Sequence, residues 1–547
     1  MRTAALAFAV VFGLAPLAWA QPVPGTRLEP AEEARVRAEL RRLKSEYARY
    51  DVGATGLEGI WQVTLTRTLA RSGGRTEVTP AAGEWILTRS GADVTIAGRL
   101  ILAGRTTGKF EARGALGADG SLALPYKATV AGEGELRLER DGDGLRVRLT
   151  GKVGADDVRA EGTAARAVGS TRAELEAELF ALGSRLQAHR YPRPAPTRAQ
   201  TNGGRVGLRF TPSAEHDPQG VEADVVRLIG AAERTIDLAV FEFSIPRVAE
   251  ALVAAQERGV RVRMVYDSRE EGQPALEHLK ARGVPVRGDQ RSTYMHNKFM
   301  VIDGKTVWTG STNMSPNGVY ISDNAALTFQ SASLAAQYTI EFEEMFVAGQ
   351  FGTRSPANTS RDWIRVDAST RVQVFFAPED NAMDRLIQAV RGARRSVKVL
   401  AFAFTSEALY QALVERIQAG VKVEVVFESL HAGWRHTKTG PLHAAGASVR
   451  FDKNPDAMHH KVVVIDDRIV CTGSFNFSDG ADRQNDENLL VVQSAVLARA
   501  FAREFRAIFD VCDPNDPRLA TSGMAGRNPD GSLSIIDAIG GEPEPGP

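Results

Sequence analysis

A repeated set of polar residues constrains the fold of this 547-residue chain more than any other feature. In each copy a histidine is followed by lysine two residues later, aspartate seven later, serine fifteen later and asparagine seventeen later. An acidic residue comes next, 27 residues after the first histidine and 28 after the second. The copies are His296, Lys298, Asp303, Ser311, Asn313 and Asp323, then His459, Lys461, Asp466, Ser474, Asn476 and Glu487. A single His-Lys pair on a strand is usually a surface feature, whereas two copies that match at six positions predict a functional site.

Both copies lie in segments where helical and strand patterns alternate. The expected elements are helix 221–232, strand 235–243, helix 248–258, strand 261–266, and their counterparts 383–391, 396–404, 408–417 and 422–427. Val-rich strands between helices predict α/β domains with a largely buried sheet. We therefore expect two α/β repeats, at residues 205–355 and 371–512, packed as a pseudo-dimer within a monomer.

The motif itself is expected to lie on strands. His-x-Lys alternation places both side chains on one face, because side chains alternate with a period of two along a strand. Residues 295–304 read as a strand and turn followed by a return strand, and residues 458–467 repeat this pattern. Polar residues at the ends of buried strands of an α/β sheet often form sites.

The first 200 residues follow other patterns. Segment 21–56 contains an amphipathic, charge-rich helix. Short alternating runs with glycine-bearing turns over 57–168 predict an antiparallel β module of about seven or eight strands, a small barrel or a sandwich. A helix and a Pro-rich linker are expected at 169–204. Residues 513–547 are rich in Pro, Gly, Asp and Ser and are expected to form an extended tail.

Residues 1–20 have the pattern of a signal peptide. Arg2 supplies the positive end, residues 4–17 are mostly apolar, and residues 18–20 read Ala-Trp-Ala, a small-x-small cleavage site. An uncleaved anchor is the alternative, but the apolar run is shorter than the roughly 20 residues that span a bilayer. We expect a periplasmic or secreted protein.

The chain has two cysteines, Cys471 and Cys512. In an oxidising compartment they have the option of pairing, and two buried free thiols are the favoured alternative.

The charges balance at 67 Lys+Arg against 67 Asp+Glu, which argues against a broadly polycationic binder. Residues 21–200 carry 28 basic and 23 acidic residues, net +5, whereas residues 201–547 carry 38 and 44, net −6. Binding along a nucleic-acid strand would favour a basic catalytic half. The distribution therefore favours a phospholipid substrate over nucleic acid.

His-x-Lys-x4-Asp followed by Gly-Ser-x-Asn, present twice within residues 205–512, resembles the phospholipase D superfamily. That family includes phospholipases, cardiolipin synthases, bacterial nucleases and tyrosyl-DNA phosphodiesterases. The resemblance implies one active site where the motifs meet at a pseudo-twofold axis, with no metal or other cofactor required. It also implies a phosphohistidine intermediate, with His296 as the nucleophile and His459 as the general acid/base. The residues implied to surround the phosphate oxygens are Lys298, Lys461, Asn313 and Asn476.

The resemblance also assigns supporting roles. Glu487 and Asp323 stand at the positions of the acids that orient the histidines. Asp323 departs from the more usual glutamate, which leaves open how this shorter side chain reaches its histidine. The residues expected to be structural, capping the strand turns or completing the motif, are Asp303, Asp466, Ser311 and Ser474.

The substrate remains open at this point. An exported hydrolase of phospholipid head groups, acting at a membrane surface, is favoured, and a metal-independent nuclease acting on DNA or RNA is the alternative. Transphosphatidylation, as in cardiolipin synthases, is a third activity, and a non-enzymatic envelope-binding role for the β module is of a different class. Four residues between sheet elements belong either to a solvated loop or to a substrate contact, namely His431, Trp434, His436 and His443.

Overall fold

A computed structural model describes residues 28–47, 59–90, 93–102, 106–115, 122–129, 132–141, 144–166, 172–194, 196, 198–201, 203–434 and 436–520. The chain divides into two compact units, which we describe separately. The barrel unit is Ala31–Leu182, and the repeat unit is Gly183–Pro547 together with Met1–Pro30. The predicted signal peptide, residues 1–20, and residues 521–547 of the predicted tail lie outside the described residues. No described helix combines the length and apolar character needed to cross a bilayer.

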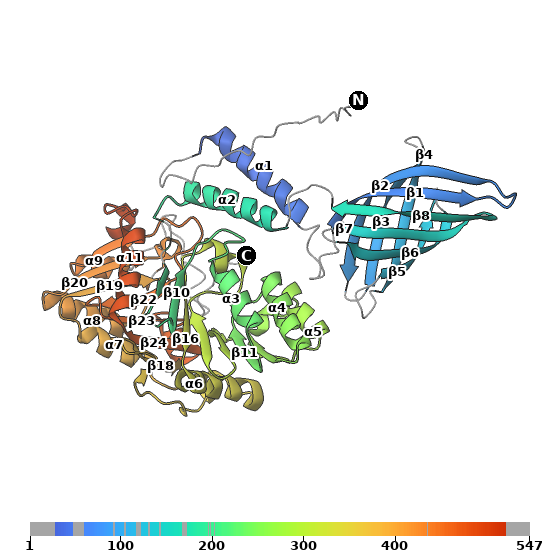
Figure 1. The fold of residues 1–547 in the computed structure, drawn as a ribbon. Coiled ribbons are helices and arrows are strands. Elements are labelled where there is room, and N and C mark those ends of the chain that lie inside the picture. The colour runs from blue at the N-terminus through green and yellow to red at the C-terminus, as the bar shows by residue number, and fades with distance from the viewer. Residues whose placement is uncertain are drawn as a thin grey trace. The chain divides into compact units, whose positions relative to one another are not determined.

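The β module is a closed barrel of eight antiparallel strands, so the barrel alternative is confirmed (Figure 1). Helix α1 (Pro30–Tyr47) precedes β1 (Gly59–Ala70), β2 (Thr76–Ser90), β3 (Asp93–Leu102), β4 (Thr106–Ala115), β5 (Leu122–Ala128), β6 (Gly132–Asp141), β7 (Gly144–Val153) and β8 (Asp156–Arg166). Inward-facing side chains alternate with exposed ones, and Trp85 stacks on Phe110 at 4.2 Å inside the barrel. The barrel closes where β8 pairs with β1, and glycine allows the two backbones to approach there. A Cβ on Gly162 would lie 1.9 Å from the backbone oxygen of Thr64.

Helix α2 (Arg172–Arg190) connects the barrel to the first repeat. The segment 169–204, which we expect to be a helix and a Pro-rich linker, contains α2 and also strand β9 (Arg198–Gln200), which pairs with β10 (Val206–Phe210). Tyr191 and Arg193, in the Pro-rich stretch, are buried rather than solvated. The Pro-rich stretch is therefore partly built into the repeat unit.

The first repeat is an eight-stranded mixed sheet in the order β13-β12-β11-β14-β15-β16-β10-β9. Its other strands are β11 (Thr235–Val240), β12 (Arg261–Tyr266), β13 (Val286–Gly288), β14 (Lys298–Ile302), β15 (Thr306–Gly310) and β16 (Ala325–Gln330). Its helices are α3 (Val221–Gly230), α4 (Pro246–Glu257), α5 (Pro274–Ala281) and α6 (Ala332–Glu343), with short turns η1 (Ser268–Glu270), η2 (Asn317–Ile321), η3 (Glu344–Ala348) and η4 (Gly352–Arg354).

The second repeat has the same topology, in the order β17-β18-β24-β23-β22-β19-β20-β21. Its strands are β17 (Ile364–Arg365), β18 (Arg371–Ala377), β19 (Ser396–Ala401), β20 (Lys422–Phe427), β21 (Ser448–Phe451), β22 (Lys461–Ile465), β23 (Ile469–Gly473) and β24 (Glu487–Gln493). Its helices are α7 (Ala382–Arg391), α8 (Glu407–Gln418), α9 (Thr439–Ala444), α10 (Asp479–Arg483) and α11 (Ala495–Phe509), with η5 (Ser429–His431) and η6 (Pro517–Ala520). The predicted mixed α/β repeats are confirmed.

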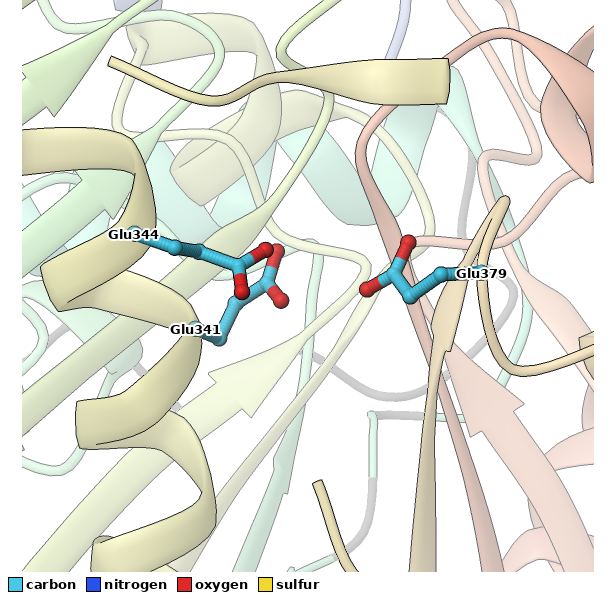
Figure 2. Close-up of side chains that lie close together, drawn as sticks. All are labelled: Glu341, Glu344 and Glu379. Atoms are coloured by element: carbon cyan, nitrogen blue, oxygen red, sulfur yellow. The ribbon is translucent and has the colours of Figure 1, made fainter. Parts of the chain in front are cut away.

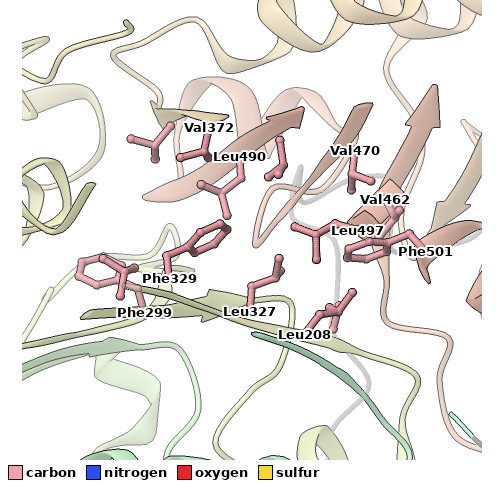
Figure 3. Close-up of a cluster of buried hydrophobic side chains, with 14 of the residues drawn as sticks. Leu208, Phe299, Leu327, Phe329, Val372, Val462, Val470, Leu490, Leu497 and Phe501 are labelled. Atoms are coloured by element: carbon pink, nitrogen blue, oxygen red, sulfur yellow. The ribbon is translucent and has the colours of Figure 1, made fainter. Parts of the chain in front are cut away.

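One hydrophobic core contains side chains from both repeats (Figure 3). Leu208 and Leu327 come from the first sheet, and Val462, Leu490 and Phe501 come from the second repeat. Burial of these side chains on both partners stabilises the contact between the repeats. The same contact places the strand ends that carry the motifs beside one another.

Candidate active site

Lys298 is the first residue of β14 and His296 lies two residues before it, and both side chains are buried. Nδ1 of His296 is 2.8 Å from each carboxylate oxygen of Glu487, the first residue of β24 in the second repeat. Lys298 donates from Nζ to the backbone oxygen of His296 over 2.9 Å. A carboxylate on Nδ1 fixes the tautomer and orientation of the ring, which leaves Nε2 for chemistry.

His459 and Lys461 repeat this arrangement, with Lys461 as the first residue of β22 and His459 two residues before it, but with one chemical difference. Nδ1 of His459 lies 2.9 Å from Oδ1 of Asn324, so the group that orients this ring is a neutral amide. Nζ of Lys461 lies 2.8 Å from Nε2 of His459. Each repeat therefore supplies the group that orients the histidine of the other, and the two groups differ in charge.

Asn324, and not Asp323, is the structural counterpart of Glu487. The backbone N–H groups of the two motif histidines donate to the backbone oxygens of Asp486 and Asp323, at 3.0 and 2.9 Å. Asp323 therefore corresponds to Asp486, which precedes Glu487. The expectation that Asp323 orients a histidine is wrong, because a shift of one residue in extended chain turns the side chain to the opposite side.

Asp323 belongs instead to a buried ion-pair network. Nη2 of Arg193 lies 2.8 Å from Oδ1 of Asp323, and the Tyr191 hydroxyl donates to Oδ2 over 3.1 Å. Arg193 also pairs with Glu504 of α11 at 2.7 Å. Burial raises the pKa of Asp323, and the charge of Arg193 opposes that rise. Sequence reasoning missed Arg193 because it lies in the Pro-rich stretch, far along the chain from both acids.

Asn313 and Asn476 follow β15 and β23, each three residues after a glycine. Both side chains are buried, and their Oδ1 atoms accept no hydrogen bond from the described part of the chain. The preceding Gly310 and Gly473 have φ of 147° and 148°, and a Cβ on either would lie 2.1 Å from a backbone oxygen of the next strand. Glycine is thus required where the chain turns toward each asparagine.

The remaining motif residues hold the backbone. Asp303 accepts backbone N–H bonds from residues 233–235 at 2.7–3.0 Å, and Asp466 accepts them from residues 394–396 at 2.8–3.0 Å. Burial acts to raise the pKa of both carboxyls, but these donors outweigh it and lower the pKa. Ser311 donates to Oδ1 of Asn324 over 2.9 Å, and Ser474 accepts a backbone N–H bond from β24.

Two phenylalanines that sequence reasoning missed flank the histidines. Phe241 meets the His296 ring edge-on at 4.8 Å, and Phe402 meets the His459 ring at 4.6 Å. The ammonium groups of both motif lysines lie over these rings, at 4.7 and 4.5 Å from the centroids. The repeated pattern Phe-x-Phe followed by Ser or Thr, which begins at these two residues, was the available signal.

The loop histidines of the second repeat separate into two groups. His431 is buried, lies 2.6 Å from the backbone oxygen of Phe402 through Nδ1, and stacks on Trp434 at 3.6 Å. His436 and His443 are exposed. Of these three histidines, only His431 packs against Phe402, the ring that contacts His459.

Three glutamates lie close together at the end of α6 and just after β18 (Figure 2). Ligand atoms of Glu341, Glu344 and Glu379 lie within 4.8 Å of one another, so among the described residues they could hold a metal ion. Burial, with help from neighbouring carboxylates, raises the pKa of Glu344 to about 7 and of Glu379 to about 8. Protonation is therefore an alternative to a cation, and neither motif histidine belongs to the cluster.

Cys471 and Cys512 are both buried and free, which confirms the free-thiol alternative. Burial raises the pKa of each thiol to about 12. Neither is part of the site.

Residues 225–346 and 386–509 match the family described as "Cardiolipin synthase, PLD-like domain". The mitochondrial cardiolipin hydrolases of Xenopus laevis and Homo sapiens are 35% and 36% identical over 135 residues, or 25% of this chain. These matches span 64% and 54% of the relatives' own lengths.

A phospholipase D of Rickettsia bellii is 29% identical over 136 residues, 25% of this chain and 68% of its own length. Among solved structures, a phospholipase D family member, Nuc from Salmonella typhimurium, is 29% identical and covers 26% of this chain and 97% of its own, with a TM-score of 0.26.

Proposed function

The chain belongs to the phospholipase D superfamily, and from this premise we propose that it is a phosphodiesterase with one active site formed by both repeats as a pseudo-dimer. The observation that carries the proposal is the exchange of orienting groups between the repeats. Glu487 holds His296, and Asn324 holds His459. Neither histidine has its orienting group without the other repeat, which supports a joint site.

The difference in charge between these groups supports His296 as the nucleophile. When Nε2 attacks phosphorus and the leaving oxygen departs, the ring retains its Nδ1 proton and becomes a cationic phosphohistidine. The Glu487 carboxylate, 2.8 Å from Nδ1, stabilises that positive charge. Asn324 offers His459 no such charge.

His459 then serves as the general acid and base. In the first step its ring gives a proton from Nε2 to the leaving oxygen, and the resulting neutral ring accepts a proton from water in the second step. That water attacks phosphorus, the bond to His296 breaks, and the phosphomonoester product leaves. Nζ of Lys461 lies 2.8 Å from Nε2, a contact in which the ammonium donates to the neutral ring that the second step requires.

Lys298, Lys461, Asn313 and Asn476 are proposed to bind the non-bridging oxygens. All four side chains are buried. The two lysines begin equivalent strands and the two asparagines follow equivalent strands, as expected for a pseudo-symmetric phosphate site. Donors fixed in a site from which water is excluded stabilise charge on the phosphoryl group more than they would in water.

We propose a phospholipid head group as the substrate. Trp434 and His431 form an aromatic wall next to Phe402, and the neighbouring Leu430 is 57% exposed. The acidic balance of residues 201–547 disfavours a nucleic-acid strand. We propose that the reaction takes place in the periplasm or outside the cell, because residues 1–20 have the pattern of a signal peptide.

A metal-independent nuclease is the second candidate, since Trp434 also offers a face on which a base can stack. The test is incubation of the protein in chelator with phosphatidylcholine, phosphatidylethanolamine, cardiolipin and plasmid DNA in separate reactions. Head-group release that is lost in His296→Asn and His459→Asn, and kept in the exposed control His443→Asn, supports the proposal. Cleavage of DNA without lipid hydrolysis overturns the substrate, and activity retained in both variants overturns the mechanism.

A further inference from the structure

A cleft of about 520 Å³ lies between the β9–β10 hairpin, β16 and α3 of the first repeat, and none of its lining residues belongs to the site described above. This volume is in the range of pockets that bind small molecules. Four arginines and one carboxylate line it, namely Arg198, Arg205, Arg209, Arg227 and Asp224. The lining groups therefore carry an excess of positive charge.

Strand register explains how the cleft forms. Arg198 of β9 pairs with Arg209 of β10, and Gly207 pairs with Gln200 on one side and Thr328 on the other. Side chains of paired residues share a face of the sheet. The side chains of Arg198 and Arg209 thus project from the same face of the sheet, on which Gly207 has no side chain.

The charges in the cleft are only partly compensated. Arg209 donates to one oxygen of Asp224 over 2.7 Å, and Arg227 contacts the other oxygen. Burial, and then the charges of Arg227 and Arg198, lower the pKa of Arg209 against the opposing effect of Asp224 and Asp217. Like charges that face each other across a ladder are destabilising, so a multivalent anion would relieve them.

In the second repeat, the position equivalent to Gly207 carries a side chain. Val206 and Leu208 face the shared core as Val372 and Val374 do, which makes Gln373 the counterpart of Gly207. The Gln373 side chain accepts from Arg385 over 3.0 Å and donates to the backbone of Arg361 over 2.6 Å. The counterpart of Arg209 is Phe375, which packs in a separate hydrophobic core of the second repeat. The basic cleft is therefore particular to the first repeat.

We propose that this cleft binds a phosphate-bearing anion. Several guanidinium groups on different strands match the several oxygens of a phosphate better than the two of a carboxylate. The anion is either a lipid head group or a soluble phosphate. The proposal does not depend on hydrolysis by the histidines, because no cleft residue takes part in it.

Gly207→Gln tests the cleft without removing a charge. A Cβ at this position would lie 3.9 Å from Nη1 of Arg209 and from Cβ of Thr328, which are ordinary contacts. Arg198→Gln is the second variant, and Arg371→Gln, on β18 of the second repeat, is the matched control. All are made in the full-length chain, with rates of head-group release measured in parallel and expected to be unchanged.

Titration with pyrophosphate and flotation with phosphatidylcholine vesicles, with and without phosphatidic acid, separate the two sources. We expect binding that weakens about tenfold or more in Gly207→Gln and in Arg198→Gln, and not in Arg371→Gln. Cleft-dependent vesicle binding assigns a lipid head group, and cleft-dependent pyrophosphate binding alone assigns a soluble phosphate. Equal binding by the wild type and both cleft variants, or no binding of either probe, overturns the proposal.

Discussion

Asn324 and Glu487 occupy equivalent positions in the two repeats, yet one presents a neutral amide to a histidine and the other a carboxylate. The contacts are nearly the same length, at 2.9 and 2.8 Å. The site is therefore symmetric in geometry and asymmetric in charge, and that asymmetry distinguishes the roles of the two histidines.

Glu487→Gln should slow phosphoenzyme formation by roughly a hundredfold or more, because an amide stabilises the cationic ring of His296 less than a carboxylate does. Rapid-quench kinetics of head-group release in a single turnover measures this step. Asp323→Asn is the control, since the side chain of Asp323 contacts neither motif histidine in the described structure and its backbone contact with His459 is kept, so its single-turnover rate should stay near that of the wild type. Equal losses in the two variants would contradict the assignment.

Arg193→Met should destabilise the protein by about 3–5 kcal/mol, because it leaves the carboxylates of Asp323 and Glu504 buried without their cation. Urea unfolding measures the change. The matched control is Arg391→Met, which breaks an exposed Arg–Glu pair with Glu415 and should cost less than about 1 kcal/mol. Similar costs for both variants would show that the buried network does not hold the Pro-rich stretch.

The glutamate cluster predicts a stability that falls with rising pH. The raised pKa of Glu379, about 8, means that the folded state holds its proton more tightly than the unfolded chain does. The stabilisation is fully present below about pH 4.5 and is lost as the pH rises through about 8. Glu379→Gln should therefore gain roughly 2–4 kcal/mol over the wild type between pH 5 and pH 9 in chelator. Exposed Glu415→Gln is the control, and a Glu379→Gln gain that does not depend on pH would be inconsistent with this account.

Gly473→Ala should cost about 2 kcal/mol or more and reduce activity, because its Cβ would collide with the backbone oxygen of Asn488, next to Glu487. Gly480→Ala, in α10, is the matched control because no atom lies within 4 Å of its added Cβ. Thermal unfolding and the rate of head-group release measure both effects. A Gly473→Ala protein with normal stability and rate would show that this close approach is not required.

The repeated motif predicted much of the site from sequence alone, because strand periodicity fixes the face on which His296 and Lys298 lie. The orienting group of His459 was not predictable in this way. The family resemblance assigned this role to Asp323, whereas the next residue, Asn324, contacts His459. Only the pairing of strand ends between repeats decides which of the two side chains faces the histidine.

Other features depended on contacts that are distant in sequence. Whether the β module was a barrel or a sandwich turned on the pairing of β1 with β8, about which local alternation carries no information. The basic cleft depended on the register that sets Arg198 opposite Arg209. The Pro-rich stretch gave no sign that Arg193 would be buried between two acids.

The most direct test is to locate the covalent intermediate. Wild-type protein is mixed with phospholipid, quenched in base, which preserves phosphohistidine, and digested for mass spectrometry. We predict a phosphatidyl adduct, reduced to glycerophosphoryl when the base removes the acyl chains, on the peptide that carries His296 and absent in His296→Asn. An adduct on His459 in place of His296, or turnover without any adduct, would contradict the account.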